Sequence, residues 1–281
     1  MLGFSRARFR REARKAGREL VKDFNKELDK INKANQRKVD RHNARVRANQ
    51  RRRLNELNRL NARSTTTTRY VPYQASMHTL QQSFTRIEEA SEQGSWVADD
   101  DLFDMVEAEA ANSVAFLNAL LDEPTRDTGV DARLRDTVIT SELREISPEL
   151  DDRWSGALFS LSPANRDAAR QFCTSAREIL VGILNVKAPK EAVLTAKPGI
   201  KLIKGEVPRR EQIYYCLARG GQQNPELVNF VADNINNVMD LFPTLNPATH
   251  GEAGLYDLVE LRAIKQRVEG AIQFLHRIVS F

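Results

Sequence analysis

The sequence predicts an all-α protein made of two unlike parts, a long basic helix followed by a compact multi-helix bundle. Three observations support this fold class. Apolar residues recur at steps of three or four along most of the chain, which is the spacing of one face of an α-helix. The 281 residues include only 13 glycines and 10 prolines, which argues against a turn-rich β fold. Basic and acidic residues are also segregated, so that residues 1–63 carry a net charge of +14 and the remainder −9.

Residues 1–63 form the predicted basic helical arm, with 21 Lys/Arg against 7 Asp/Glu and no proline. Its apolar stripe is thin, because Asn35 and His42 stand where a coiled coil would have aliphatic residues. We therefore expect a long helix of marginal stability. Two arrangements are open, a dimeric coiled coil through Leu54, Leu57 and Leu60, and a helix that becomes ordered only on binding.

The charge of the arm predicts an anionic partner, since each Lys or Arg that contacts a phosphate releases counterions. We expect this partner to be the backbone of RNA or DNA. The residues predicted to contact it from the arm are Arg37, Lys38, Arg41, Arg45, Arg47, Arg51, Arg52 and Arg53. A solvated spacer helix is the simpler alternative. An anionic membrane surface is a third, disfavoured because the arm lacks a face rich in Trp, Phe and Leu.

Behind the arm, the polar run at 64–68 predicts a linker over 64–73. A helical middle region over 74–146 and a C-terminal helical domain over 147–281 follow, the latter opening with Ser147 as N-cap and Pro148 in the first turn. Residues 197–207 are the one segment where short strands or an ordered loop are expected. The expected helices include 74–91, 99–122, 132–146, 165–185, 226–242 and 256–279.

Several kinds of chemistry find no support in the sequence. Nucleotide-binding glycine loops and Cys/His zinc spacings are both missing. The run Asp99–Asp101 suggests a metal site, but acidic residues in a first helical turn are better explained by the helix dipole, so we predict no metal and no cofactor. The two cysteines, Cys173 and Cys216, are predicted to be small core residues, which suits the reducing cytoplasm. No apolar run reaches 18 residues, so no membrane partner is expected.

One segment has the composition of a catalytic loop. His250 follows Asn246 between two predicted helices, and an imidazole there is a candidate general acid or base at neutral pH. Arg177, or Arg209 and Arg210, would supply the cation for a phosphate. The alternatives are structural, since a loop histidine often caps a helix and Arg177 has Asp240 or Glu260 as possible ion-pair partners.

Four stretches resemble a known family, Trp154–Leu158, Arg170–Leu180, Pro208–Arg210 and Asn246–Gly251. They resemble the predicted nuclease domains associated with prokaryotic PIWI-like (pPIWI) proteins of bacterial conflict systems, over about residues 147–281. The order of helices is also similar to that of HEPN domains, which are helical, usually dimeric and often metal-independent ribonucleases. Asn246 and His250 match the later part of the HEPN motif, whereas residues 243–245, where its Arg would stand, are Pro, Thr and Leu.

The resemblance implies a bacterial antiphage protein with a HEPN-like C-terminal bundle. It implies a metal-independent nuclease with His250 as acid or base, Asn246 as the residue that orients the histidine, and Arg177 as the phosphate-binding residue. Expected partners are nucleic acid, a second copy of the chain and other proteins of the defence system. The missing Arg of the motif leaves open a non-catalytic scaffold subunit that binds nucleic acid or protein. A coiled-coil oligomerisation protein without nucleic acid is a third hypothesis.

Overall fold

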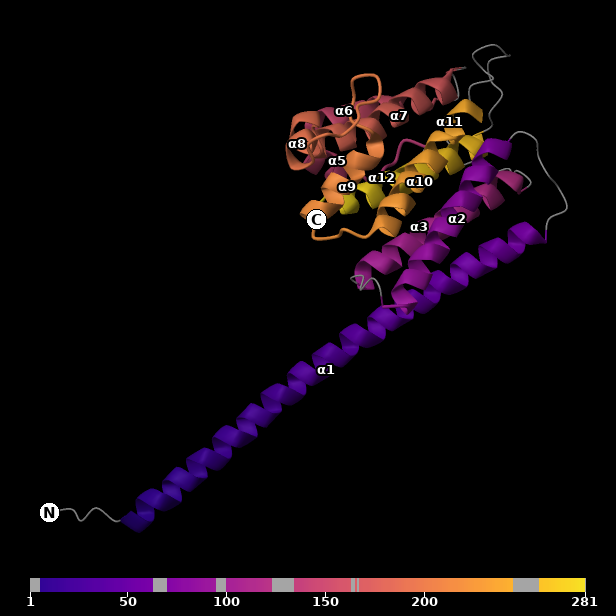
Figure 1. Cartoon of the computed structure of the whole chain (residues 1–281). Coiled ribbons are helices and arrows are strands. Elements are labelled where there is room, and N and C mark those ends of the chain that lie inside the picture. The colour runs from indigo at the N-terminus through magenta and orange to yellow at the C-terminus, as the bar shows by residue number, and fades with distance from the viewer. Residues whose placement is uncertain are drawn as a thin grey trace. The chain divides into compact units, whose positions relative to one another are not determined.

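The computed structural model describes residues 6–62, 70–94, 100–122, 134–162, 165, 167–244 and 258–280. The chain divides into two compact units, Met1–Ala48 and Asn49–Phe281. Within the described ranges the regular structure is helical (Figure 1), apart from an isolated antiparallel bridge between Ile203 and Glu206. The all-α prediction is therefore confirmed. Among the described helices, no segment combines the length and the hydropathy of a transmembrane span.

Helix α1 (Arg6–Asn61) begins in the first unit and ends in the second. The described part of the first unit is this helix alone. Its apolar side chains consequently find no core within that unit, and Leu20, Phe24 and Ile31 are 72%, 62% and 54% exposed. The long basic helix is confirmed.

The last turns of α1, from Asn49 onward, belong to the second unit. Leu57 and Leu60 pack against the core of that unit. Asn118 of α3 (Asp100–Leu121) donates to both the backbone carbonyl and the side-chain carboxylate of Glu56, at 2.8 and 2.7 Å. Two of the three leucines of the predicted dimer contact therefore pack within their own chain, and the dimer itself stays a prediction.

The remaining helices of the second unit follow the predicted amphipathic segments, with shifts at their ends. They are α2 (Val71–Glu92), α5 (Thr140–Ile146), α6 (Pro148–Ser160), α7 (Ala168–Lys187), α8 (Lys190–Ala196), α9 (Arg209–Arg219), α10 (Pro225–Met239), α11 (Leu241–Thr244) and α12 (Leu258–Val279). The expected helix over 226–242 is divided, because α10 ends at Met239 and the short α11 follows it. The ordered loop expected over 197–207 is present, and its turn at Lys204 and Gly205 has positive φ angles of 53° and 83°.

One hydrophobic core joins these helices. Helix α2 packs against α10 and α3, α12 packs against α3, α7 and α10, and α6 packs against α5 and α7. Aromatic side chains fill the centre, with Trp154 against Phe172 at 5.5 Å between ring centroids and Phe84 against Phe230 at 6.5 Å. Because α2 and α3 share this core with α10 and α12, residues 74–146 and 147–281 form one compact unit.

Candidate nucleic-acid site

Arg177 lies on the exposed side of α7. The core stripe of this helix, which includes Phe172, Ala176 and Leu180, turns the neighbouring position 177 away from the core. The Arg177 guanidinium carbon lies 5.7 Å from the centroid of the Phe242 ring on α11. Arg177 forms no ion pair with any described residue, so the pairing with Asp240 or Glu260 that the sequence left open is not observed.

Arg209 opens α9 close to Arg177. One of its guanidinium nitrogens donates to Asn236 Oδ1 at 3.2 Å, and the residue is half-buried. Burial lowers the pKa of Arg209, and the positive charge of Arg177 lowers that pKa further. Within the described part of the chain no carboxylate forms an ion pair with either arginine. The two guanidinium groups therefore form a locally uncompensated positive site.

This arrangement is suited to an anion with several oxygen acceptors. A guanidinium presents its N–H groups in a planar fork that matches phosphate oxygens. Arg209 and the exposed Arg210 also stand at the first turn of α9, where the helix dipole adds partial positive charge. The sequence predicts three cations for a phosphate, Arg177, Arg209 and Arg210. They lie on α7 and α9, two helices that pack against each other.

A hollow of about 430 Å³ opens beside Arg177, between α6 and α7. Its lining combines apolar and charged side chains, namely Ser147, Glu149, Leu150, Arg153, Arg177, Glu178, Val181, Gly182, Asn185 and Val186. No motif in the sequence marks this hollow, because it depends on how two helices pack.

Neither cysteine is placed for nucleophilic chemistry. Cys173 and Cys216 are each 3% exposed. Burial raises the pKa of Cys173 to about 12 and that of Cys216 to about 11, against weaker opposing effects of nearby basic groups. Both thiols therefore stay protonated at neutral pH, as expected of core residues.

The catalytic loop proposed from the sequence lies outside the described residues, and this applies to both Asn246 and His250. Helix α11 ends at Thr244, two residues before Asn246, and carries Phe242, the ring that contacts Arg177. The residue that contacts Arg177 therefore lies four residues before Asn246 in the sequence.

The arm residues divide into an exposed set and one buried exception. The exposed residues are Arg37, Lys38, Arg41, Arg45 and Arg47 in the first unit, and Arg51 and Arg52 in the second. Arg53 is 9% exposed and lies 4.3 Å from the centroid of the Phe84 ring. It pairs with Glu88 at 3.0 Å and with Glu107 at 3.4 Å. Arg53, predicted from the sequence to contact nucleic acid, thus has its guanidinium paired with carboxylates of its own chain.

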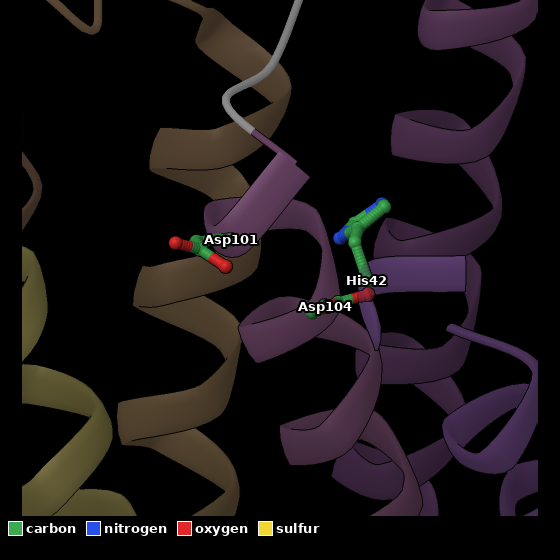
Figure 2. Close-up of side chains that lie close together, drawn as sticks. All are labelled: His42, Asp101 and Asp104. Carbon is green, nitrogen blue, oxygen red and sulfur yellow. The ribbon is translucent and has the colours of Figure 1, made fainter. Parts of the chain in front are cut away.

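The first turns of α3 contain carboxylates from the acidic run that suggests a metal site in the sequence. Figure 2 shows Asp101 and Asp104 in the first turns of this helix, where carboxylates complement the positive end of the dipole. Asp101 is exposed and Asp104 is buried, and the backbone carbonyl of Asp104 accepts a hydrogen bond from Asn49 at 3.2 Å. His42, also labelled there, is a partly exposed residue of α1 in the first unit. Asp100 is helical, whereas Asp99 lies outside the described residues.

Part of the chain is similar to a known protein family. The model of a family described as predicted pPIWI-associating nuclease matches residues 143–275. No curated protein and no solved structure matches the chain. The matched segment contains Arg177, Arg209 and the hollow between α6 and α7, and it excludes α1. Residues 143–275 thus match the predicted pPIWI-associating nuclease family, the family that the sequence resemblance indicated.

Proposed function

We propose that this protein is a nuclease of a bacterial pPIWI-type defence system and acts on RNA or DNA through the second unit. The observation that carries the proposal is the pair Arg177 and Arg209, which places two guanidinium groups without a described carboxylate partner inside the segment that matches the nuclease family. Arg209 is half-buried, and neither guanidinium has a carboxylate partner among the described residues, so an anionic ligand best explains the pair.

In the proposed reaction the arginines bind the phosphate and His250 moves the proton. With an RNA substrate, neutral His250 accepts the proton of the 2′-hydroxyl, O2′ attacks phosphorus, and the bond from phosphorus to O5′ breaks. The leaving oxygen takes a proton from solvent or from the protonated imidazole. Arg177 and Arg209 stabilise the negative charge that develops on the phosphoryl oxygens, and Asn246 orients the imidazole. The residues named require no metal ion.

The exposed basic residues of α1 would add affinity for the nucleic-acid backbone without reading its sequence. These are the residues from Arg37 to Arg52 named above, without Arg53. We also propose that the protein works as a homo-oligomer in the cytoplasm with other proteins of the defence system, and that its C-terminal bundle is HEPN-like.

The alternative function is a non-catalytic subunit that holds nucleic acid or protein in a defence complex. It is favoured by one feature of the sequence, because Pro243, Thr244 and Leu245 occupy the positions where the HEPN motif has its Arg. In this alternative the same arginine pair binds phosphate, and no bond is broken.

The decisive experiment incubates the purified protein with labelled single-stranded RNA, duplex RNA and DNA in EDTA. Wild type is compared with His250→Ala and with a variant that lacks residues 1–48. Cleavage in EDTA that His250→Ala abolishes supports the metal-independent nuclease. Binding without cleavage supports the scaffold. Cleavage that requires added Mg²⁺ contradicts the metal-independent mechanism. The absence of both binding and cleavage contradicts the nuclease and the nucleic-acid scaffold alike, and leaves a scaffold that binds protein.

A further inference from the structure

The hollow between α6 and α7 has an apolar floor. Leu150 is buried there, and Val181 and Val186 line the same space. Gly182 permits the close approach of the two helices, because a Cβ at this position would lie 2.8 Å from Leu150 Cδ2. The floor is therefore built by direct packing of α6 on α7 and offers apolar surface to a ligand.

The rim of the hollow is charged but nearly balanced. Arg153 donates to Glu149 Oε1 at 3.1 Å and forms a second ion pair with Glu178. Two carboxylates therefore hold one guanidinium, and Arg177 adds a second positive charge that has no carboxylate partner among the described residues. Such a rim does not attract a polyanion into the hollow as a whole. It favours a neutral ring inside and a phosphate at the edge where Arg177 stands.

We propose that this hollow binds one unpaired nucleobase of the strand whose phosphate is held by Arg177. The inference rests on the proposed function and deepens it, since it assigns single-stranded nucleic acid as the substrate class. A volume of about 430 Å³ lies in the range of small-ligand sites and admits a single nucleotide rather than a duplex. A base must leave its helix to be held in this way.

The chemistry of the rim also selects the kind of base. An ionised carboxylate has about four lone-pair sites, so Glu149 and Glu178 keep acceptor capacity after pairing with Arg153. Carboxylates accept hydrogen bonds from exocyclic amino groups such as N4 of cytosine. The preferred base is therefore one that carries an amino group.

The test separates base recognition from phosphate recognition. Full-length protein is titrated, by fluorescence anisotropy, with oligocytidine and with an abasic oligomer of equal length and phosphate number, each in ribose and deoxyribose form. Wild type is expected to bind the base-bearing strand about tenfold more tightly, because a base held on the apolar floor of the hollow is removed from water. Val186→Phe fills the hollow from a position that is 47% exposed, so it should leave the fold intact. It is expected to remove the tenfold preference and to leave the affinity for the abasic strand unchanged.

Val138→Phe is the matched control, because Val138 is 67% exposed and does not line the hollow. It should keep the preference, and circular dichroism should show that both variants melt as wild type does. Equal wild-type affinity for both strands, or a preference that survives Val186→Phe, overturns the inference while the proposed function stands. Failure to bind either strand at low salt overturns the proposed function and the inference together.

Discussion

The guanidinium of Arg267 on α12 and the carboxylate of Glu109 on α3 form an ion pair that is closed to solvent. Their side chains are 0% and 2% exposed. The remaining N–H groups of Arg267 donate to Asn234 Oδ1 at 2.7 Å, to Asn237 Oδ1 at 3.0 Å and to the Tyr73 hydroxyl at 3.3 Å. The pair thus connects α12, α3, α10 and α2, the helices that form one side of the core.

Arg267→Met should destabilise the second unit strongly. The variant leaves the Glu109 carboxylate buried without its cation, and breaking a buried pair in this way typically costs about 3–5 kcal/mol. Urea unfolding followed by circular dichroism measures the loss. Arg170→Met is the control, because Arg170 pairs with Asp167 on the surface of α7. A loss from Arg267→Met no larger than that of the control would contradict a structural role for the buried pair.

Arg53→Ala should lower the free energy of unfolding, whereas Arg52→Ala should leave it nearly unchanged. Arg53 compensates Glu88 and Glu107, whose pKa values burial raises and Arg53 lowers in part. Its neighbour Arg52 is exposed. We expect a loss of about 2–4 kcal/mol for Arg53→Ala, because a buried carboxylate loses its partner. Equal midpoints of urea unfolding for the two variants would show that Arg53 is not buried as described.

Removal of residues 1–48 should leave the second unit folded, whereas removal of residues 1–63 should destabilise it. The longer deletion takes away Leu57 and Leu60, which pack against the core, and the acceptors of Asn118 on Glu56. Thermal unfolding of the two truncated proteins, compared with the full chain, checks the boundary. If both melt at the same temperature, residues 49–62 contribute nothing to the stability of the second unit.

Cys173 and Cys216 should resist alkylation in the native protein. The pKa values of about 12 and about 11 leave almost no thiolate at pH 8, and the thiolate is the form that reacts. Iodoacetamide at this pH should label both residues only after denaturation, as read by intact mass. Rapid labelling of the folded protein would contradict the core placement of the thiols.

The features that the sequence predicts correctly are those that depend on the local spacing of apolar residues. The helices of the second unit were predictable because their apolar residues follow a helical period, and Arg177 because that period leaves it outside the core stripe. The pairs Arg267 with Glu109 and Arg53 with Glu88 join helices that are far apart in sequence, and no local signal marks them. A clue to Arg53 existed, since Arg53, Leu57 and Leu60 share one helical face through steps of four and three.

For the arginine site, too, the sequence predicts single residues but not the packing that brings them together. The sequence predicts Arg177 and Arg209 as cations for a phosphate one residue at a time, without predicting that they lie close together. Their proximity results from the packing of α7 against α9, and the hollow beside Arg177 results from the packing of α6 on α7. Neither relationship could be read from spacing along the chain.

The central claim is that Arg177 and Arg209 bind phosphate, and the salt dependence of nucleic-acid binding tests it most directly. The affinity for a single strand is measured over a range of salt concentrations for wild type, for the double variant Arg177→Ala/Arg209→Ala and for the control Arg170→Ala. Each phosphate contact contributes about 0.7 to the slope of log affinity against log salt for single strands. The double variant should therefore bind more weakly and lose about 1.4 from the slope, whereas Arg170→Ala should behave as wild type. If the double variant has wild-type affinity and slope, Arg177 and Arg209 do not bind phosphate and the proposed site is wrong.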